Sequence, residues 1–431
     1  MMLLLQAPVG QLDQGSRLVV IDPVHPDKEI LLTEEFGFAG SAEVSFDAKN
    51  VIFEARKTLE DTWQIYEINL ESLEVSQITH SETDCRDPAY LPEGRVVYSR
   101  LIQDDNATDY HVLETIQLNG SDIRQITFGP VDHRASSVLN DGRILVCSRQ
   151  IHPAQGEMML TVMRPDGTKS DLFYKGKEAQ IVLNKAIETD DGRVIFRELK
   201  TNNPTEAQVA SVPYNNPMGA VDNLSLGVEG DFISAGLSSS NRLLVCYRSN
   251  PAKPIGLFEL KTDSGTGLTP VYENENYDVL QASTITPVKR PRNLPSAVDS
   301  KVETALLMCQ DATFYGKSKA KDLSGQSKKA VKIEVLGVEG PLGVADLERD
   351  GSFYIKMKAD TPFRLQTLDE NNNLVSGPGS WMNLRPNERR ACVGCHTGQN
   401  RVPENRQPLA VRKEPIEIPM YTDKIMANAI K

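Results

Sequence analysis

The stretch Leu139-Asn-Asp-Gly-Arg-Ile-Leu-Val-Cys-Ser-Arg149 decides the fold, because close copies of it recur along the first two thirds of the chain. Each copy opens with an Asp-Gly-like turn that supplies the positive-φ positions of a tight hairpin, then runs into a short β-branched segment typical of a buried strand. The first apolar residues after these turns are Val51, Val96, Ile144, Val194 and Leu243, which gives a period of 45–50 residues. Short strands at such a period are typical of a β-propeller.

The second half of each unit is an alternating strand pair, such as 63–70 with 75–79 and 111–118 with 123–127. The Asp-Gly turns and the Gln-Ile-Thr ends of these pairs resemble the repeats of TolB-type propellers. Five units are complete, and the two ends of the repetitive region supply the halves of a sixth. We therefore predict an all-β fold with a six-bladed β-propeller over residues 16–290, closed by pairing of its two ends.

The region after the propeller reads as a second, smaller β domain. A proline-rich, basic linker leads into alternating runs at 330–336, 351–357 and 362–368, which predict a small antiparallel β-sandwich. The predicted organisation is an N-terminal tail at 1–15, the propeller at 16–290, a linker at 291–300, the sandwich at 301–385, and a haem-attachment segment with the C-terminal tail at 386–431.

The segment Ala391-Cys-Val-Gly-Cys-His396 is a C-x-x-C-H, the pattern by which a c-type haem is attached. Cys392 and Cys395 would form thioethers to the two vinyl groups of one porphyrin, and His396 would present its imidazole to the iron. A structural zinc site usually takes two such cysteine pairs, and Cys309, the nearest other cysteine, is far away in sequence. A redox dithiol should follow a strand and open a helix, whereas loop residues flank this pair. We predict one haem c, with zinc, a dithiol or unmodified cysteines as the alternatives.

The residues around the motif suggest how the haem would be held. Arg389, Arg390 and Arg401 flank it and suit contacts with haem propionates, although each is equally explained as a surface charge. Met420 is the candidate sixth ligand of the iron, since a returning tail can reach it. A methionine or histidine there gives an electron carrier, and an open position gives a site for small molecules. The five histidines before the motif are expected to be solvated or hydrogen-bonded.

The C-terminal third resembles a known family. The segments 350–354, 359–369, 388–396 and 404–410 are similar to the haem-bearing domain of hydrazine synthase alpha-subunit-like proteins. Those proteins place that domain after a six-bladed propeller, so the resemblance implies both the fold and the haem. Hydrazine synthase alpha subunits also carry a second haem motif, and a tyrosine four residues after the motif histidine, where this chain has Asn400.

The composition indicates which kinds of partner and which cellular compartment to expect for the protein. The net charge of −12 argues against nucleic acid or anionic lipid as the main partner, and no apolar run is long enough to span a membrane. No signal peptide is evident at the start, yet haem c is attached outside the cytoplasm, so we expect a periplasmic or extracellular protein. Six cysteines in so long a chain make no disulfide framework, and the four outside the motif are expected to be buried thiols.

The main functional interpretation is a monohaem c-type cytochrome subunit for electron transfer, with the propeller as a docking platform. Its partner would be a redox protein or a larger membrane-associated or extracytoplasmic complex. One alternative is a haem enzyme acting on a small nitrogen or oxygen species, as in hydrazine synthase-like proteins. Another is a propeller-based assembly subunit with a structural haem. No G-x-S-x-G, H-E-x-x-H or P-loop motif occurs, and the sequence leaves open whether the chain is an enzyme.

Overall fold

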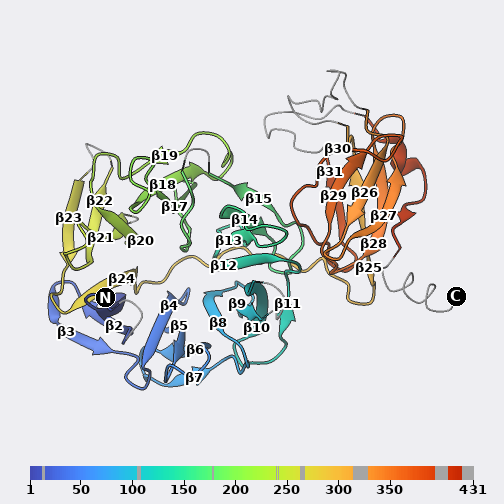
Figure 1. Ribbon diagram of the computed structural model, residues 1–431. Coiled ribbons are helices and arrows are strands. Elements are labelled where there is room, and N and C mark those ends of the chain that lie inside the picture. Colours follow the sequence, from blue (N-terminus) through green and yellow to red (C-terminus); the bar gives the residue numbers. More distant parts are fainter. Residues whose placement is uncertain are drawn as a thin grey trace. The chain divides into compact units, whose positions relative to one another are not determined.

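A computed structural model describes residues 1–11, 15–103, 108–176, 179–238, 240, 242–262, 267–313, 329–393 and 406–419. Over these residues the chain is nearly all β, with one short 3-10 helix, η1 (Leu409–Arg412) (Figure 1). It divides into two compact units. Unit 1 consists of Met1–Gln125, Asp132–Pro165 and Asp171–Leu294. Unit 2 consists of Ile126–Val131, Asp166–Ser170 and the described residues from Pro295 onward.

Unit 1 contains six four-stranded sheets among its described residues. The first two are β24 (Tyr277–Thr284)–β1 (Met2–Pro8)–β2 (Arg17–Asp22)–β3 (His25–Leu31) and β4 (Phe38–Val44)–β5 (Asn50–Arg56)–β6 (Gln64–Asn69)–β7 (Val75–Gln77). The next two are β8 (Cys85–Tyr90)–β9 (Arg95–Ile102)–β10 (Tyr110–Gln117)–β11 (Arg124–Gln125) and β12 (Val131–Val138)–β13 (Ile144–Gln150)–β14 (Met159–Met163)–β15 (Asp171–Tyr174). The last two are β16 (Ile187–Glu188)–β17 (Arg193–Leu199)–β18 (Ala207–Pro213)–β19 (Asp222–Asn223) and β20 (Asp231–Leu237)–β21 (Leu243–Arg248)–β22 (Gly256–Lys261)–β23 (Gly267–Tyr272).

These sheets follow one another around a common centre, with β4, β8, β12, β20 and β24 on the inside (Figure 1). The arrangement is a β-propeller, as the repeat predicted. The Asp-Gly turns lie where the first strand of a sheet turns into the second, and Gly142 has the left-handed φ of 88° that such a turn requires. A Cβ at Gly142 would also lie 1.9 Å from the carbonyl oxygen of Arg292, so this turn admits no larger residue.

The residues predicted as an N-terminal tail contain strand β1, which corrects that prediction. Leu4 of β1 is fully buried and is the register partner of Val19 in β2 and of Ala282 in β24. A short apolar run at the start of the sequence resembles a tail. The partner that makes it a central strand is almost three hundred positions away.

Hydroxyl side chains explain the Gln-Ile-Thr ends of the repeats. Thr79 follows β7, and its Oγ1 accepts a hydrogen bond from the backbone N–H of Ile65 at 2.8 Å. Thr33 does the same for Leu18 at 2.9 Å in the sheet that contains β1. Each threonine therefore satisfies a backbone donor of the third strand beyond the point where the short fourth strand ends.

Four aspartates join neighbouring sheets of unit 1. Each lies at the first strand of one sheet and accepts a hydrogen bond from a backbone N–H at the start of the third strand of the preceding sheet. The pairs are Asp84 with Trp63 at 2.9 Å, Asp132 with His111 at 2.9 Å, Asp231 with Ala207 at 3.1 Å and Asp278 with Ile255 at 2.7 Å. A hydrogen bond to a charged acceptor contributes about 1.5–3 kcal/mol, so these contacts fix the order of the sheets as well as stabilising them.

Unit 2 is built on two further four-stranded sheets. They are β31 (Arg389–Cys392)–β25 (Thr304–Cys309)–β28 (Phe353–Lys358)–β32 (Ile416–Glu417) and β27 (Pro341–Asp346)–β26 (Lys332–Leu336)–β29 (Arg364–Leu368)–β30 (Leu374–Ser376). Leu307 and Ile355 from the first sheet share one buried cluster with Ile333 and Val335 from the second. The two sheets therefore enclose a common core, as in a sandwich.

The first of these sheets differs from the predicted antiparallel sandwich. β31 pairs with β25 and β32 pairs with β28 in parallel, so the sheet is mixed and continues beyond residue 385. The segment Arg389–Cys392 lacks an alternating apolar pattern because it is an edge strand, and β32 is exposed at both of its residues. Polar and charged residues are favoured at such edges, which hides these strands from a hydrophobic-pattern analysis.

Candidate haem-attachment site

The first cysteine of the predicted haem motif ends a β-strand. Cys392 is the last residue of β31, its side chain is half-buried, and it is not disulfide-bonded. Cys395, His396, Arg401 and the candidate sixth ligand Met420 lie outside the described residues. The loop that the sequence predicts before the motif is therefore an edge strand of the unit 2 sandwich.

The alternation of β31 separates the two arginines before the motif. Arg390 and Cys392 are partly buried, whereas Arg389 is exposed on the other face. The guanidinium of Arg390 is paired with the buried carboxylate of Glu388, with 2.8 Å between Nη2 and Oε1. Glu388 also accepts the backbone N–H of Arg385 at 2.9 Å. Contacts of Arg389, Arg390 and Arg401 with haem propionates stay a prediction, and for Arg390 they would compete with Glu388.

Gln310, the residue after β25, contacts the chain on both sides of the motif. Its backbone N–H donates to the carbonyl oxygen of Cys392 at 2.9 Å. Its carbonyl oxygen accepts from Nη2 of Arg406 at 3.2 Å. The chain that enters the motif at Cys392 and the chain that returns at Arg406 are therefore held at one position of the sandwich.

The returning chain is held further by Asp350. Its carboxylate pairs with Nη1 of Arg406 and accepts the backbone N–H of Leu409 at 2.9 Å. Burial opposes ionisation of Asp350, but hydrogen bonds from Ser352 and from the Leu409 N–H, with the charge of Arg406, outweigh it and lower the pKa to about 2. We name Asp350, Arg406 and Gln310 the return clamp.

A second cysteine, Cys309, lies beside Cys392 in the structure, although the two are far apart in the sequence. Cys309 is the last residue of β25 and the register partner of Cys392 in the parallel pair. It is 2% exposed, and Cys392 packs against the apolar cluster that contains it. Parallel pairing between distant segments leaves no local signal, so the sequence could not place these two thiols together. Among the described residues no group of three or more His, Cys, Asp or Glu side chains is arranged to hold a metal ion.

The histidines of unit 1 show no common site. His133 is buried with Nδ1 2.9 Å from Oγ of Ser148, and burial lowers its pKa to about 4. His111 is paired with Asp132, and His25 with Asp22. These three are hydrogen-bonded, as expected from the sequence.

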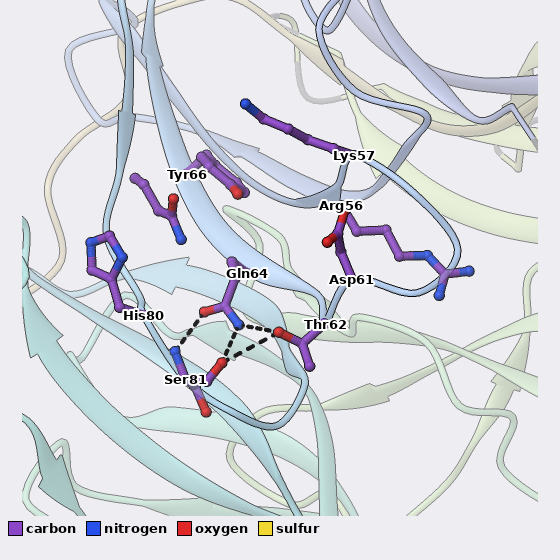
Figure 2. A pocket seen from close by; sticks show the side chains of 9 residues that line it. Arg56, Lys57, Asp61, Thr62, Gln64, Tyr66, His80 and Ser81 are labelled. Carbon is purple, nitrogen blue, oxygen red and sulfur yellow. Dashed lines mark hydrogen bonds between the residues drawn. The ribbon is translucent and has the colours of Figure 1, made fainter.

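A polar pocket of about 280 Å³ lies on the sheet β4–β7 (Figure 2). It is lined by Arg56, Lys57, Asp61, Thr62, Gln64, Tyr66, Gln77, His80 and Ser81. Both polar atoms of the Gln64 amide are hydrogen-bonded. Nε2 donates to Oγ1 of Thr62 at 2.7 Å and to the carbonyl oxygen of Ser81 at 2.8 Å. Its Oε1 accepts from the Ser81 N–H at 3.0 Å and from Thr79 at 2.8 Å. These bonds brace β6 against the chain after β7, and we assign no ligand to the pocket.

The described residues include no helix with the length and apolar character needed to cross a membrane.

The fold and the motif define a class of protein: an all-β chain in which a β-propeller precedes a sandwich that carries a Cys-x-x-Cys-His segment. The family described as "Hydrazine synthase alpha subunit middle domain" matches residues 306–397. Residues 306–397 of the chain therefore resemble the middle domain of hydrazine synthase alpha subunits.

Individual proteins are also similar to the chain. The chain is 22% identical to hydrazine synthase subunit alpha of Kuenenia stuttgartiensis over 90% of its own length, and it spans 63% of the length of that relative. The solved hydrazine synthase of Kuenenia stuttgartiensis matches 95% of the chain, and 71% of its own, with a TM-score of 0.82 at 18% identity, which shows the shared fold. TolB from Acinetobacter baumannii aligns over 65% of each chain at 15% identity and a TM-score of 0.49.

Proposed function

We propose that the chain is the haem-bearing subunit of a hydrazine synthase-like complex and acts on a small nitrogen or oxygen species. The observation that carries this proposal is the family match, which runs from residue 306 to 397 and so includes the whole Cys392–His396 motif. The relative with this name is a subunit, which supports a multi-subunit assembly. Fold analogy alone does not fix a reaction, so the proposal needs a direct test.

The described residues fit a covalently attached haem. Cys392 offers a half-buried sulfur at the end of an edge strand. The return clamp holds the chain on both sides of the motif, so that attachment would occur on a fixed frame. Cys392 and Cys395 would hold the porphyrin, and His396 would bind its iron. The haem would supply a redox-active iron whose potential depends on the sixth ligand and its surroundings.

We further propose that unit 1 is a six-bladed propeller that serves as a docking platform. Its six four-stranded sheets and the pairing of β1 with β24 support six blades and a closed ring. Placing β1 between β24 and β2 covers the edges that these two strands would otherwise expose, which supports a rigid surface for a partner subunit. Because haem c is attached outside the cytoplasm, we also propose an exported protein.

Electron transfer by a single haem c remains the second candidate, because the chain has one Cys-x-x-Cys-His motif where the resemblance implies two in hydrazine synthase alpha subunits. The two functions differ at the sixth position of the iron. If Met420 fills it, carbon monoxide and nitric oxide should leave the ferrous spectrum nearly unchanged. An open position should give a new spectrum with either gas.

The test is to produce the full chain with a c-type haem maturation system and measure its intact mass and visible spectrum. We expect the mass of one haem on the wild-type chain. Cys392→Ala and Cys395→Ala should each lower covalent loading, and Cys246→Ala, a buried cysteine of unit 1, should not. A wild-type mass equal to that of the bare polypeptide after maturation would overturn the haem assignment.

A further inference from the structure

We propose that Cys309 and Cys392 form an intramolecular disulfide, and that this modification withholds Cys392 from haem attachment. The disulfide itself follows from the arrangement of β25 and β31. Its effect on haem attachment rests on the proposed function.

The pairing of the two strands places the cysteines opposite each other. β25 and β31 run parallel in continuous register from Leu306↔Arg389 to Cys309↔Cys392. Neighbouring strands lie about 4.7–4.9 Å apart, which is inside the Cα–Cα range of roughly 4.4–6.8 Å found across disulfides. The spacing of the paired strands is therefore compatible with a bond between the two sulfur atoms.

The two side chains also lie on the same face of the sheet. Along β25, Ala305, Leu307 and Cys309 face the buried cluster of the sandwich, and Cys392 packs against this cluster from β31. Opposed residues of a parallel pair project from one side, since side chains alternate along each strand. Both thiols therefore occupy the same side at the end of the strand pair.

The other described cysteines are unsuited to this chemistry. Cys85, Cys147 and Cys246 lie in three different sheets of unit 1 and are almost fully buried. Cys85 lies opposite Arg100, Cys147 opposite Leu160, and Cys246 opposite Ser234 and Leu257, so none of the three is set against another cysteine. Among the described cysteines, Cys309 and Cys392 make up the one register pair.

The oxidant for this step is a small disulfide or an oxidised dithiol protein, the class that maintains disulfides outside the cytoplasm. The thiolate of Cys392 reacts first, because its side chain is half-buried whereas Cys309 is 2% exposed. It attacks the oxidant's disulfide, forms a mixed disulfide and releases one thiol. The Cys309 thiolate then attacks the Cys392 sulfur and releases the second thiol. One S–S bond breaks and one forms, and both protons end on the released thiols.

The disulfide blocks thioether formation by simple chemistry. A haem thioether forms when an S–H adds across a vinyl C=C, with no oxidant and no leaving group. A sulfur atom already bonded to another sulfur has no S–H to add. A chain oxidised at Cys309 and Cys392 can therefore accept haem only after reduction.

The first experiment tests the disulfide without any haem. The full chain, produced without haem, is treated with glutathione disulfide, alkylated, digested without reductant and analysed by mass spectrometry. We expect a peptide pair linked through Cys309 and Cys392 that disappears after reduction. Cys309→Ala should lack it, and Cys246→Ala should keep it. Alkylation of both thiols with no linked pair in the oxidised wild-type chain overturns the proposal, and this result needs no variant to fold.

The second experiment tests the consequence during haem attachment. Haem loading of the oxidised wild-type chain should fall, relative to the reduced chain, by the fraction that carries the disulfide. Cys309→Ala should load equally in both states. Linked peptides with equal loading in both states would overturn the blocking role. If no chain loads haem under any condition, the proposed function fails, while the disulfide is judged by the first experiment alone.

Discussion

At the scale of single residues, His133 shows how burial can override the usual charge of a side chain. It lies on β12, is 8% exposed, and its Nδ1 is 2.9 Å from Oγ of Ser148 on β13. Burial lowers its pKa to about 4, although the neighbouring Asp132 carboxylate favours the protonated form. The imidazole is therefore neutral at pH 7, and protonating it is coupled to unfolding of unit 1.

We expect His133 to make unit 1 less stable as the pH falls from about 6.5 to about 4. The folded pKa of about 4 is below the unfolded value near 6.5, so in this range the unfolded chain binds the proton and the folded chain does not. His133→Gln should therefore reduce the loss of unfolding free energy between pH 7 and pH 5 by about 2 kcal/mol. Urea unfolding of unit 1 at both pH values measures this. The same change at exposed His80 is the control, and an equal pH dependence in the two variants would contradict the expectation.

At the scale of elements, the return clamp ties η1 and the chain before it to the start of β28. The Asp350 carboxylate receives Arg406 and the Leu409 N–H, and the N–H of Ala410 donates to Oγ of Ser352 at 3.0 Å. Arg406 also reaches the carbonyl oxygen of Gln310 beyond β25. The clamp therefore joins three segments that are distant in sequence, which the local pattern around each of them does not reveal.

Asp350→Asn should weaken the sandwich by about 2 kcal/mol, because it removes the charge that Arg406 and the Leu409 N–H share. In the wild-type chain the clamp's contribution should be complete above about pH 4 and should be lost as the pH falls through the folded pKa of about 2. Urea unfolding of unit 2 at pH 7 and at low pH measures both effects. Asp346→Asn, at an exposed position of β27, is the matched control. Equal unfolding free energies for the two variants at pH 7 would rule out the clamp.

The elements also show what a sequence can and cannot predict here. β13 and β21 begin at Ile144 and Leu243, the first apolar residues after their turns, because turn chemistry and β-branched runs are local signals. β31 has no such signal, since an edge strand written Arg-Arg-Ala-Cys carries one arginine on each of its faces. The proximity of Cys309 to Cys392 depends on a parallel pairing across more than eighty residues. The motif is visible in the sequence and its haem stays a prediction, whereas the residues that lie beside Cys392 in the fold could not be read from the sequence.

At the scale of the whole molecule, the closure of unit 1 depends on its first strand. β1 lies between β24 and β2, so the sheet at the start of the chain is completed only by residues 277–284. Such a contact has a high loop-closure cost in folding and leaves two strands with free edges whenever it opens. The stability of the ring should therefore be most sensitive to changes in β1 that leave every other sheet intact.

Leu4→Ala should lower the free energy of unfolding of unit 1 by about 2–5 kcal/mol, because Leu4 is fully buried between two partner strands. Leu59→Ala, at a position 60% exposed, should change it by less than about 0.5 kcal/mol. Deleting residues 1–8 should have a further effect, since it exposes the edges of β2 and β24 and so promotes association between chains. Urea unfolding measures the first two changes, and sedimentation velocity measures the third. A truncated chain that stays monomeric with an unchanged unfolding midpoint would show that the ring does not need β1, and the closed propeller proposed for unit 1 would have to be abandoned.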